Sequence, residues 1–291
     1  MKILMKSGLS KENFIVRKKL NENNIEIQLL KEFYSNEISL MQYFNMIVNS
    51  ELDVSIIHTP LVDGEDVEID DFYDKIKKDV FFKTCELANM VGIKFNKNIM
   101  VIVHSSMNFN QDITNLNKIA LIDNVLFDVF NKYPNILIAI ENIIPLANNY
   151  KGYYGRNGFL NDNCMYVDYF IDKYGFKDKI GTVLDTCHAL VTIKLLEYCK
   201  ISITLDKFFE WNKKNVMLIH LANLGDNGYG KNNHGIGFIE GKDLELLSDI
   251  MYLYHKYEYD CPITIEVREK DYLNPVNYLK TKENLLSINS F

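Results

Sequence analysis

An acidic residue and a histidine follow one of the most apolar stretches of the chain. Residues 180–184 are largely apolar and include three β-branched side chains, a pattern that favours a strand buried on both faces. Asp185 comes directly after this stretch, and His188 follows three residues later. A carboxylate is costly in a dry core unless it is paired or binds a cation. We therefore expect Asp185 at the open end of the strand, with His188 in the turn beside it.

Other apolar stretches of the sequence also end in a histidine or an acid. Predicted strand ends carry His58, His104, Glu141, Asp185, His220 and Glu266, and the connections after two of them carry His188 and His234. Imidazole and carboxylate groups, with no cysteine at an equivalent position, form the ligand set for zinc, manganese or a related divalent ion. His255 falls within a predicted helix, and we assign it no role.

Each of these residues also has a purely structural interpretation. A single strand-end histidine is more often a hydrogen-bonded rim residue than a metal ligand. Glu141 could cap the segment after it, and Asp185 could be the N-cap of a helix over Ala189–Leu196. The recurrence of such residues on five or six consecutive units favours one shared site over independent structural roles.

The elements that would position these residues alternate along the chain. Eight apolar runs are the predicted strands: Lys2–Lys6, Ile25–Leu30, Val54–His58, Ile99–His104, Ile136–Glu141, Gly181–Asp185, Val216–His220 and Pro262–Glu266. Amphipathic helical patterns lie between them, the clearest at Ile38–Val48, Asp71–Val91, Leu121–Phe130 and Leu244–Tyr257. Alternation of this kind implies right-handed βαβ units and a parallel sheet.

Eight such units predict an α/β fold that is a single (β/α)8 TIM barrel spanning residues 1–291 as one domain. An open doubly wound sheet would need a glycine-rich phosphate turn after the first strand, and Met5–Leu9 does not provide one. In a barrel the C-terminal ends of all strands converge on one face. The strand-end acids and histidines would then lie within reach of a common centre.

Composition narrows the class of protein further. The formal net charge of -7 gives no global basic field that would attract nucleic acid or an anionic membrane. The five cysteines are odd in number and show no CxxC pair, which is typical of a reduced, cytoplasmic protein. No apolar run approaches the roughly 18 residues needed to span a bilayer. We expect no membrane partner, and no protein partner is evident from the sequence.

Two connections are unusually long for a compact domain. Residues 142–163 are rich in Asn, Gly and Tyr, and residues 221–241 are rich in Gly and Asn. Loops of this length are often functional, although they can also be surface decoration. Arg156 in the first loop and Asn232 in the second are candidate substrate-binding residues, together with Arg268 shortly after the last strand.

Seven short motifs occur in a characteristic order along the chain. They are His58-Thr59-Pro60, His104-Ser105, Glu141-Asn142, Leu184-Asp185-Thr186-Cys187-His188-Ala189, His220-Leu221, Asn233-His234 and Ile265-Glu266. In this order the chain resembles the xylose isomerase-like TIM barrel superfamily, and within it most closely the endonuclease IV-type apurinic/apyrimidinic endonucleases. The resemblance covers residues of about 54 to 267. Leu-Asp-Thr-Cys-His-Ala is its most specific part.

The resemblance implies a site for two or three zinc ions. His58 and His104 would hold one ion, Glu141 would bridge to a second, and Asp185, His220 and Glu266 would complete that second site. His188 and His234 would hold the third ion. Glu141 and Glu266 would be the catalytic residues, and the substrate would be DNA with abasic sites, cleaved by a metal-activated hydroxide.

Three features of the chain depart from the endonuclease pattern. Asn232 stands where that family has an aspartate ligand of the third metal, so this site could be weak, empty or completed by Asp226. Leu61 replaces an aromatic residue that helps the family probe DNA, and Ala222-Asn223 replaces an Asn-Asp pair. The segment from Val62 to Asp71 is strongly acidic and would repel a phosphate backbone.

Two other functions therefore stay open. A metal-dependent sugar or sugar-phosphate isomerase or epimerase of the same superfamily would need only Glu141, Asp185, His220 and Glu266 around one Mn²⁺, Mg²⁺ or Co²⁺. Glu141 and Glu266 would then shuttle a proton between adjacent carbons. A catalytically silent binding barrel is disfavoured by the many costly ligand residues. The additional histidines favour the nuclease.

Overall fold

The computed structural model describes residues 1–35, 38–106, 109–144, 159–198, 200–225 and 234–289. Eight parallel strands close into one barrel in the order β1-β10-β7-β6-β5-β4-β3-β2. Their bounds are β1 Ile3–Gly8, β2 Asn24–Gln28, β3 Asp53–His58, β4 Ile99–His104, β5 Ile136–Glu141, β6 Ile180–Asp185, β7 Val216–Leu221 and β10 Ile263–Ile265. The predicted (β/α)8 barrel and all eight predicted strands are confirmed.

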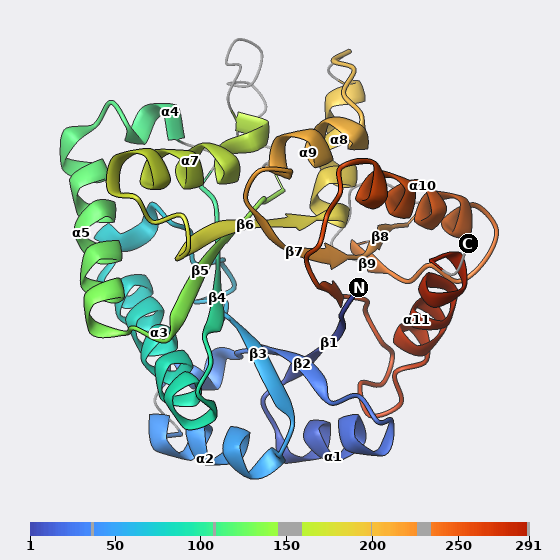
Figure 1. Cartoon of the computed structure of the whole chain (residues 1–291), viewed down its shortest axis with the longest axis horizontal. Helices are drawn as coiled ribbons and strands as arrows, with labels where there is room; N and C mark the ends of the chain where they lie inside the picture. The colour runs from blue at the N-terminus through green and yellow to red at the C-terminus, as the bar shows by residue number, and fades with distance from the viewer. Residues whose placement is uncertain (36–37, 107–108, 145–158, 199, 226–233, 290–291) are drawn as a thin grey trace.

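Helices surround the barrel as an outer ring (Figure 1). They are α1 Lys11–Lys19, α2 Leu40–Ser50, α3 Lys75–Phe95, α4 Phe109–Asp112, α5 Leu116–Lys132, α7 Asp162–Tyr174, α8 Thr186–Tyr198, α9 Leu205–Asn212, α10 Lys242–Lys256 and α11 Val276–Ile288. Short 3-10 turns cover Lys31–Phe33, Asp71–Tyr73 and Phe159–Asn161, and β8 Asn223–Leu224 pairs antiparallel with β9 His234–Ile236 just beyond β7. Much of both long connections falls outside the described residues.

The helix predicted to begin at Asp71 begins later than expected. Asp71–Tyr73 forms a 3-10 turn, and α3 starts at Lys75. The reason is the side chain of Asp74, whose carboxylate accepts hydrogen bonds from the backbone N–H groups of Ile76 and Lys77. An aspartate in this N-cap position satisfies donors that have no partner inside the helix, and so fixes the start of the helix.

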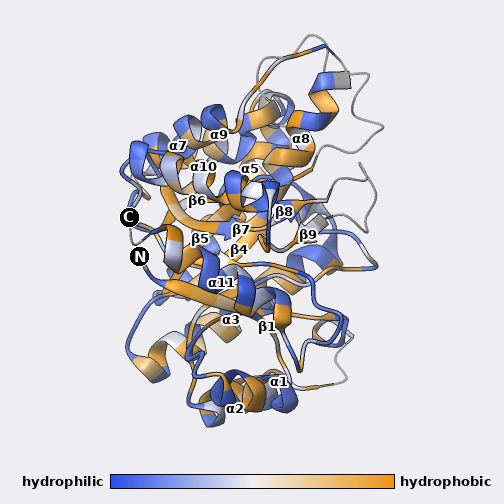
Figure 2. Ribbon diagram, turned by 90° about the vertical axis from the view of Figure 1, so that its right-hand side faces the viewer, coloured by the Kyte–Doolittle hydropathy of each residue, from blue (hydrophilic) through white to orange (hydrophobic). Residues whose placement is uncertain are grey.

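Apolar side chains fill the space between barrel and helices, and a smaller set fills the barrel itself. Hydrophobic residues concentrate in the central strands, whereas helices such as α1 and α11 carry both polar and apolar residues (Figure 2). The interior set consists of Leu4, Ile56, Met100, Ile102, Ala139, Val183 and Leu218, one or two from each of six strands. Among the described residues, no helix is long and apolar enough to cross a membrane.

Gly181 of β6 packs directly against Met217 of β7 and the residue before that strand, Asn215. A Cβ atom at this position would lie 2.5 Å from Cγ of Met217 and 2.6 Å from the carbonyl oxygen of Asn215. The backbone of β7 cannot withdraw easily, because the N–H of Thr182 donates to that same carbonyl at 2.8 Å. A side chain here would therefore push apart two strands that both carry residues of the site described below.

We expect Gly181→Ala to lower the free energy of unfolding by about 2 kcal/mol, the usual cost of forcing extra volume into a packed core. The measurement is urea denaturation followed by circular dichroism. Gly8→Ala is the matched control, because its added Cβ would meet only the amide of Asn13 at 3.2 Å and a methyl group of Leu30 at 3.8 Å. Equal midpoints for the two variants would contradict the close approach of the strands.

Candidate metal centre

A ring of charged and imidazole side chains closes the C-terminal mouth of the barrel. Side chains on a strand alternate between faces, so residues two apart point the same way. Val183 of β6 points into the barrel and Asp185 follows it; Leu218 of β7 points in and His220 follows it. On each of the other strands, the residue two positions after an inward-pointing one also joins the ring. The complete ring is Lys6, Glu26, His58, His104, Glu141, Asp185, His220 and Glu266.

Six of these ring residues fall into two groups that could each hold a cation. The first group is His58, His104 and Glu141, and the second is Glu141, Asp185, His220 and Glu266. Each residue offers one ligand atom, and the ligand atoms of a group all lie within 4.8 Å of one another. The structure therefore brings together six of the eight residues predicted as metal ligands, with Glu141 common to both groups.

The two oxygens of Glu141 face in different directions. Oε2 lies 3.1 Å from Nε2 of His58 and 3.7 Å from Nε2 of His104, on the side of the first group. Oε1 lies 3.2 Å from Nδ1 of His220, on the side of the second group. A carboxylate divided in this way can serve two neighbouring cations at once. The contacts described for the Glu141 oxygens are with imidazoles of the ring and not with the segment after it, which it could have capped.

Two carboxylate oxygens of the second group make no hydrogen bond within the part of the chain that the structure describes. Nδ1 of His220 lies 3.0 Å from Oε2 of Glu266 and 4.0 Å from Oδ2 of Asp185. Both oxygens are buried without a hydrogen-bond partner among the described residues, since the ion-pair contact with His220 lacks hydrogen-bond geometry. One imidazole cannot satisfy three carboxylates. Such unsatisfied buried oxygens are costly unless a cation binds them, so the residues present fit a divalent metal.

The outer nitrogens of His58 and His220 also have hydrogen-bond acceptors. Nδ1 of His58 lies 2.9 Å from the carbonyl oxygen of Thr59, which can only accept, so this nitrogen carries the proton and Nε2 is left as a ligand. Nε2 of His220 donates to Glu26 at 3.0 Å. Nδ1 of His104 lies 3.4 Å from Oδ1 of Asp66, a longer ion-pair contact. Outer partners of this kind orient the imidazoles of metal ligands.

Asp185 caps a helix with one carboxylate oxygen and leaves the other facing the second group. Its Oδ1 accepts the backbone N–H of His188 at 2.7 Å, which makes it the N-cap residue at the start of α8. The amide of Asn142 then holds the Asp185 backbone, accepting its N–H at 2.7 Å and donating to its carbonyl at 3.1 Å. Because Oδ1 is used for capping, Oδ2 is the atom turned toward the second group.

The proposed third metal position is described only in part. His188 lies beside the ring, with Nδ1 2.7 Å from the carbonyl oxygen of Asn142 and 3.5 Å from Oε1 of Glu141. The backbone of His234 belongs to β9, but its side chain is outside the description. Asn232, Asp226 and Arg156 fall outside the described residues, so their roles stay predictions.

Arg268, the remaining predicted substrate-binding residue, is exposed and lies next to β9. Its backbone N–H donates to the carbonyl of Gly235 at 2.7 Å, and a Cβ on Gly235 would lie 3.1 Å from its Cγ. Gly235 has φ +80, a conformation that an L side chain rarely adopts. The arginine therefore lies beside the strand that carries His234, at the edge of the mouth.

Glu26 and Lys6 are ring members that the sequence analysis missed. Glu26 is fully buried, and the ammonium of Lys6 lies 3.4 Å from its Oε1 and 2.7 Å from Oε1 of Glu266. The signal was present, because both residues occupy alternate positions in short apolar strands. It could be used only once the barrel had closed and it was known which face of β1 and β2 points inward.

Burial and mutual charge shift the acid–base behaviour of the ring. Burial alone would raise the pKa of Glu141, but the facing imidazoles of His220 and His104 bring it well below its usual value. The pKa of Glu266 is also well below its usual value, because Lys6 and His220 outweigh burial. Burial raises the pKa of Asp185 to about 6. His220, despite its burial, has its pKa raised well above the usual value by Glu26 and Glu141.

Two lysines that could contact a phosphate backbone, Lys77 and Lys214, pair with acidic side chains. The ammonium of Lys77 lies 2.7 Å from Asp71 and 3.2 Å from Glu65. Lys214 pairs with Asp168 at 2.9 Å. It lies just before the N-terminal end of β7, and the ring lies at the C-terminal ends of the strands, so Lys214 is at the opposite end of the barrel. Lys214 is therefore wrongly placed for a substrate at the ring.

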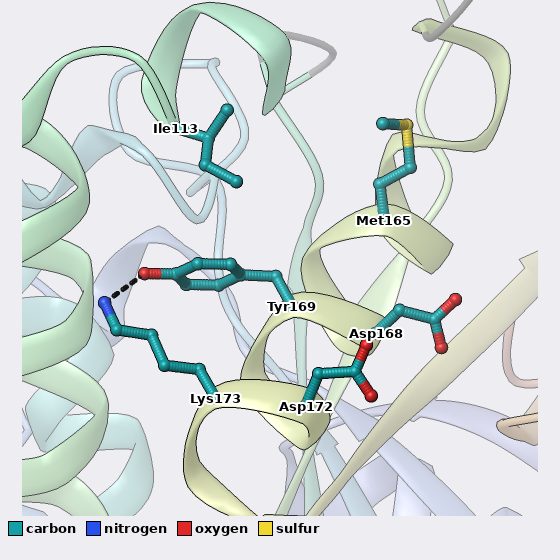
Figure 3. A pocket seen from close by; sticks show the side chains of 6 residues that line it. All are labelled: Ile113, Met165, Asp168, Tyr169, Asp172 and Lys173. Atoms are coloured by element: carbon teal, nitrogen blue, oxygen red, sulfur yellow. Dashed lines mark hydrogen bonds between the residues drawn. The ribbon is translucent and has the colours of Figure 1, made fainter.

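A surface pocket of about 530 Å³ lies away from the ring. It is lined by Ile113, Met165, Asp168, Tyr169, Asp172 and Lys173, mostly on the outer side of α7. The ammonium of Lys173 meets the hydroxyl of Tyr169 within it (Figure 3). None of its lining residues belongs to the two ligand groups, so this pocket does not contribute to the centre.

Comparison with known structures identifies the class of fold. A putative xylose isomerase from Rhodospirillum rubrum aligns with a TM-score of 0.62 at 10% identity, covering 97% of this chain and 99% of the other. A D-psicose 3-epimerase gives 0.55 at 13%, covering 100% and 98%, and a Thermus thermophilus protein soaked with ZnCl2 gives 0.54 at 13%, covering 100% and 97%. No protein-family model and no curated protein sequence matches the chain. The chain has the fold of the xylose isomerase-like TIM barrels.

Because the pKa of His220 is raised, its imidazole is protonated at pH 7 in the metal-free protein and cannot act as a ligand. We expect zinc binding to release at least one proton at pH 7, and zinc affinity to rise with pH up to the raised pKa of His220. Below pH 6, Asp185 should release a further proton.

The measurement is calorimetric titration in buffers that differ in ionisation enthalpy. His255→Asn is the control, because His255 lies on α10 with Asn289 as its partner and should leave proton release unchanged. Zinc binding without proton release at pH 7 would show that His220 does not lose a proton when the metal binds.

Proposed function

We propose that the chain is an endonuclease IV-like phosphodiesterase, which holds divalent ions, Zn²⁺ foremost, at the two ligand groups and cleaves DNA at abasic sites. The observation that supports this proposal is the first group, His58 and His104 with Oε2 of Glu141. An isomerase or epimerase built on the second group alone would not need these two buried imidazoles.

The two groups differ in the number of ligands that they offer. The second group supplies four ligand residues, whereas the first supplies three. Three protein ligands with one position left for water or substrate are typical of catalytic zinc sites, and four are typical of closed ones. In the first group the side chains of His58 and His104 are 5% and 7% exposed. In the second group His220 and Asp185 are at 0% and Glu266 is at 23%, so exposure does not separate the two groups and the number of ligands decides. We therefore infer that the substrate approaches on the side of the first group.

Two neighbouring cations would supply Lewis-acid stabilisation for both the attacking and the leaving oxygen of a phosphodiester. The residues of the chain prepare for this chemistry by orientation. Thr59 and Glu26 fix the ring nitrogens of His58 and His220, and Lys6 holds Glu266. Asp185 is locked by its capping bond and by Asn142. Preorganised groups of this kind need little rearrangement during the reaction.

One observation favours a second candidate, a metal-dependent sugar or sugar-phosphate isomerase or epimerase. The acidic segment after β3 runs along the end of β4, where Ile69 N–H donates to the carbonyl of His104 at 2.9 Å. This contact places Asp66 against the His104 ring, with the Asp66 side chain 45% exposed. Negative charge at the mouth repels a DNA backbone and tolerates a neutral sugar. Glu141 and Glu266 would then transfer the proton, with Mn²⁺, Mg²⁺ or Co²⁺ at the second group.

His104→Ala discriminates between the two activities, because it removes a ligand of the first group and leaves the second group complete. For the phosphodiesterase we expect the wild type to bind at least two ions per chain, and the variant to lose one ion and at least about a hundredfold in abasic-site cleavage, or about 3 kcal/mol. Glu141→Gln should abolish cleavage, since it alters both groups. The measurements are metal analysis and a nicking assay on an abasic duplex.

His255→Ala is the matched control, a histidine outside both groups. A wild type that binds one ion, ignores the abasic duplex and exchanges a C–H proton of a ketose would contradict the phosphodiesterase. The isomerase is then supported if His104→Ala keeps that exchange while Glu141→Gln loses it.

A further inference from the structure

Lys6 places a permanent cation beside the metal ligands. It is the inward residue of β1, its side chain is 14% exposed, and its ammonium lies 2.7 Å from Oε1 of Glu266 and 3.4 Å from Oε1 of Glu26. β1 pairs with β2 so that Lys6 is directly opposite Glu26, and Glu26 in turn accepts from His220. The lysine is thus held from two sides and has a defined position next to the second group.

The two oxygens of Glu266 have different partners, because Lys6 contacts only one of them. Oε1 is engaged by the ammonium, whereas Oε2 faces Nδ1 of His220 at 3.0 Å. One oxygen of Asp185 is also engaged, since Oδ1 accepts the N–H of His188. Glu141 turns one oxygen to each group. Every carboxylate of the second group therefore has only one oxygen available for a cation.

From this arrangement we infer that Lys6 is a specificity-determining residue for the metal. By occupying Oε1 of Glu266, it keeps the second group at four protein ligand atoms and disfavours Ca²⁺, which commonly binds a carboxylate through both of its oxygens. The inference rests on the proposed metal centre and is independent of which reaction the centre performs.

The two classes of cation differ in what they need. Ca²⁺ takes six to eight oxygen ligands and commonly binds a carboxylate through both oxygens. Zn²⁺ is typically four-coordinate and binds imidazole and single carboxylate oxygens well. A group of one imidazole nitrogen and three single oxygens satisfies Zn²⁺ and leaves Ca²⁺ short of ligands. Without the ammonium, Glu266 could present both oxygens, and the disadvantage of Ca²⁺ would decrease.

A simple charge effect predicts something different. If Lys6 acted only as a nearby positive charge, its removal would strengthen the binding of every divalent ion by a similar factor, because all carry the same charge. Occupation of one oxygen instead changes the affinity for Ca²⁺ relative to Zn²⁺. The ratio of the two dissociation constants therefore separates the two effects, whereas either constant alone does not.

The experiment measures this ratio for Lys6→Met, using metal-free protein titrated with Ca²⁺ by calorimetry and with Zn²⁺ against a chromophoric chelator. We expect the preference for Zn²⁺ over Ca²⁺ to fall on the order of tenfold, the range seen when partners of metal ligands are removed. Lys2→Met is the control, because Lys2 lies on the same segment at the other end of the barrel, pairs with Asp53 at 3.1 Å, and should keep the wild-type ratio.

Lys6→Met could fail to fold, because it leaves Glu26 and Glu266 close together without a cation. The double variant Lys6→Met/Glu26→Gln removes one charge of each sign and should show the same fall in the ratio. An unchanged ratio in a folded variant would overturn the role of Lys6, even if both affinities rise together. A wild type that binds neither ion would overturn this inference and the metal centre. A wild type that binds zinc selectively but cleaves no DNA would contradict only the proposed phosphodiesterase.

Discussion

Repulsion among buried carboxylates is the constraint on which the rest of the site depends. Glu141, Asp185 and Glu266 converge at the mouth of the barrel, and Glu26 lies beside them with no exposed surface. Charges of one sign held this close in a poorly hydrated site are unfavourable unless positive charge compensates them. His220 and Lys6 supply part of that charge, as the low pKa of Glu266 and the raised pKa of His220 show. Burial, together with the nearby Glu141 and Glu266, nevertheless raises the pKa of Asp185 to about 6.

The barrel makes this concentration of charge tolerable through its backbone. On six of the eight strands the inward-pointing residue before the ring position is apolar. Apolar side chains therefore pack inside the barrel directly next to most of the charged ring. Parallel pairing fixes the heights of neighbouring strands; for example, His104 is opposite Glu141 and Asp185 is opposite His220. Contacts to backbone carbonyls, caps and outer acids then fix the side chains. A cation entering such a site would find its ligands already oriented, which reduces the cost of binding.

Most of the fold and much of the site could be predicted from the sequence, because buried parallel strands produce continuous apolar runs with sharp ends. The strand-end position of Glu141 or Asp185 follows from this pattern directly. Glu26 could not be recognised, since an acid between Ile25 and Ile27 is also typical of a strand with one face in water. Barrel closure decides which face is inside. The contact of Asp66 with His104 depends on the path of a loop along β4, which no local pattern encodes.

The shared position of Glu141 between two ligand groups is the central claim, and anomalous diffraction tests it most directly. Crystals of zinc-loaded protein measured at the zinc absorption edge should show two peaks, one between His58, His104 and Glu141 and one between Glu141, Asp185, His220 and Glu266. A single peak, or no peak within bonding distance of Glu141, would contradict the account.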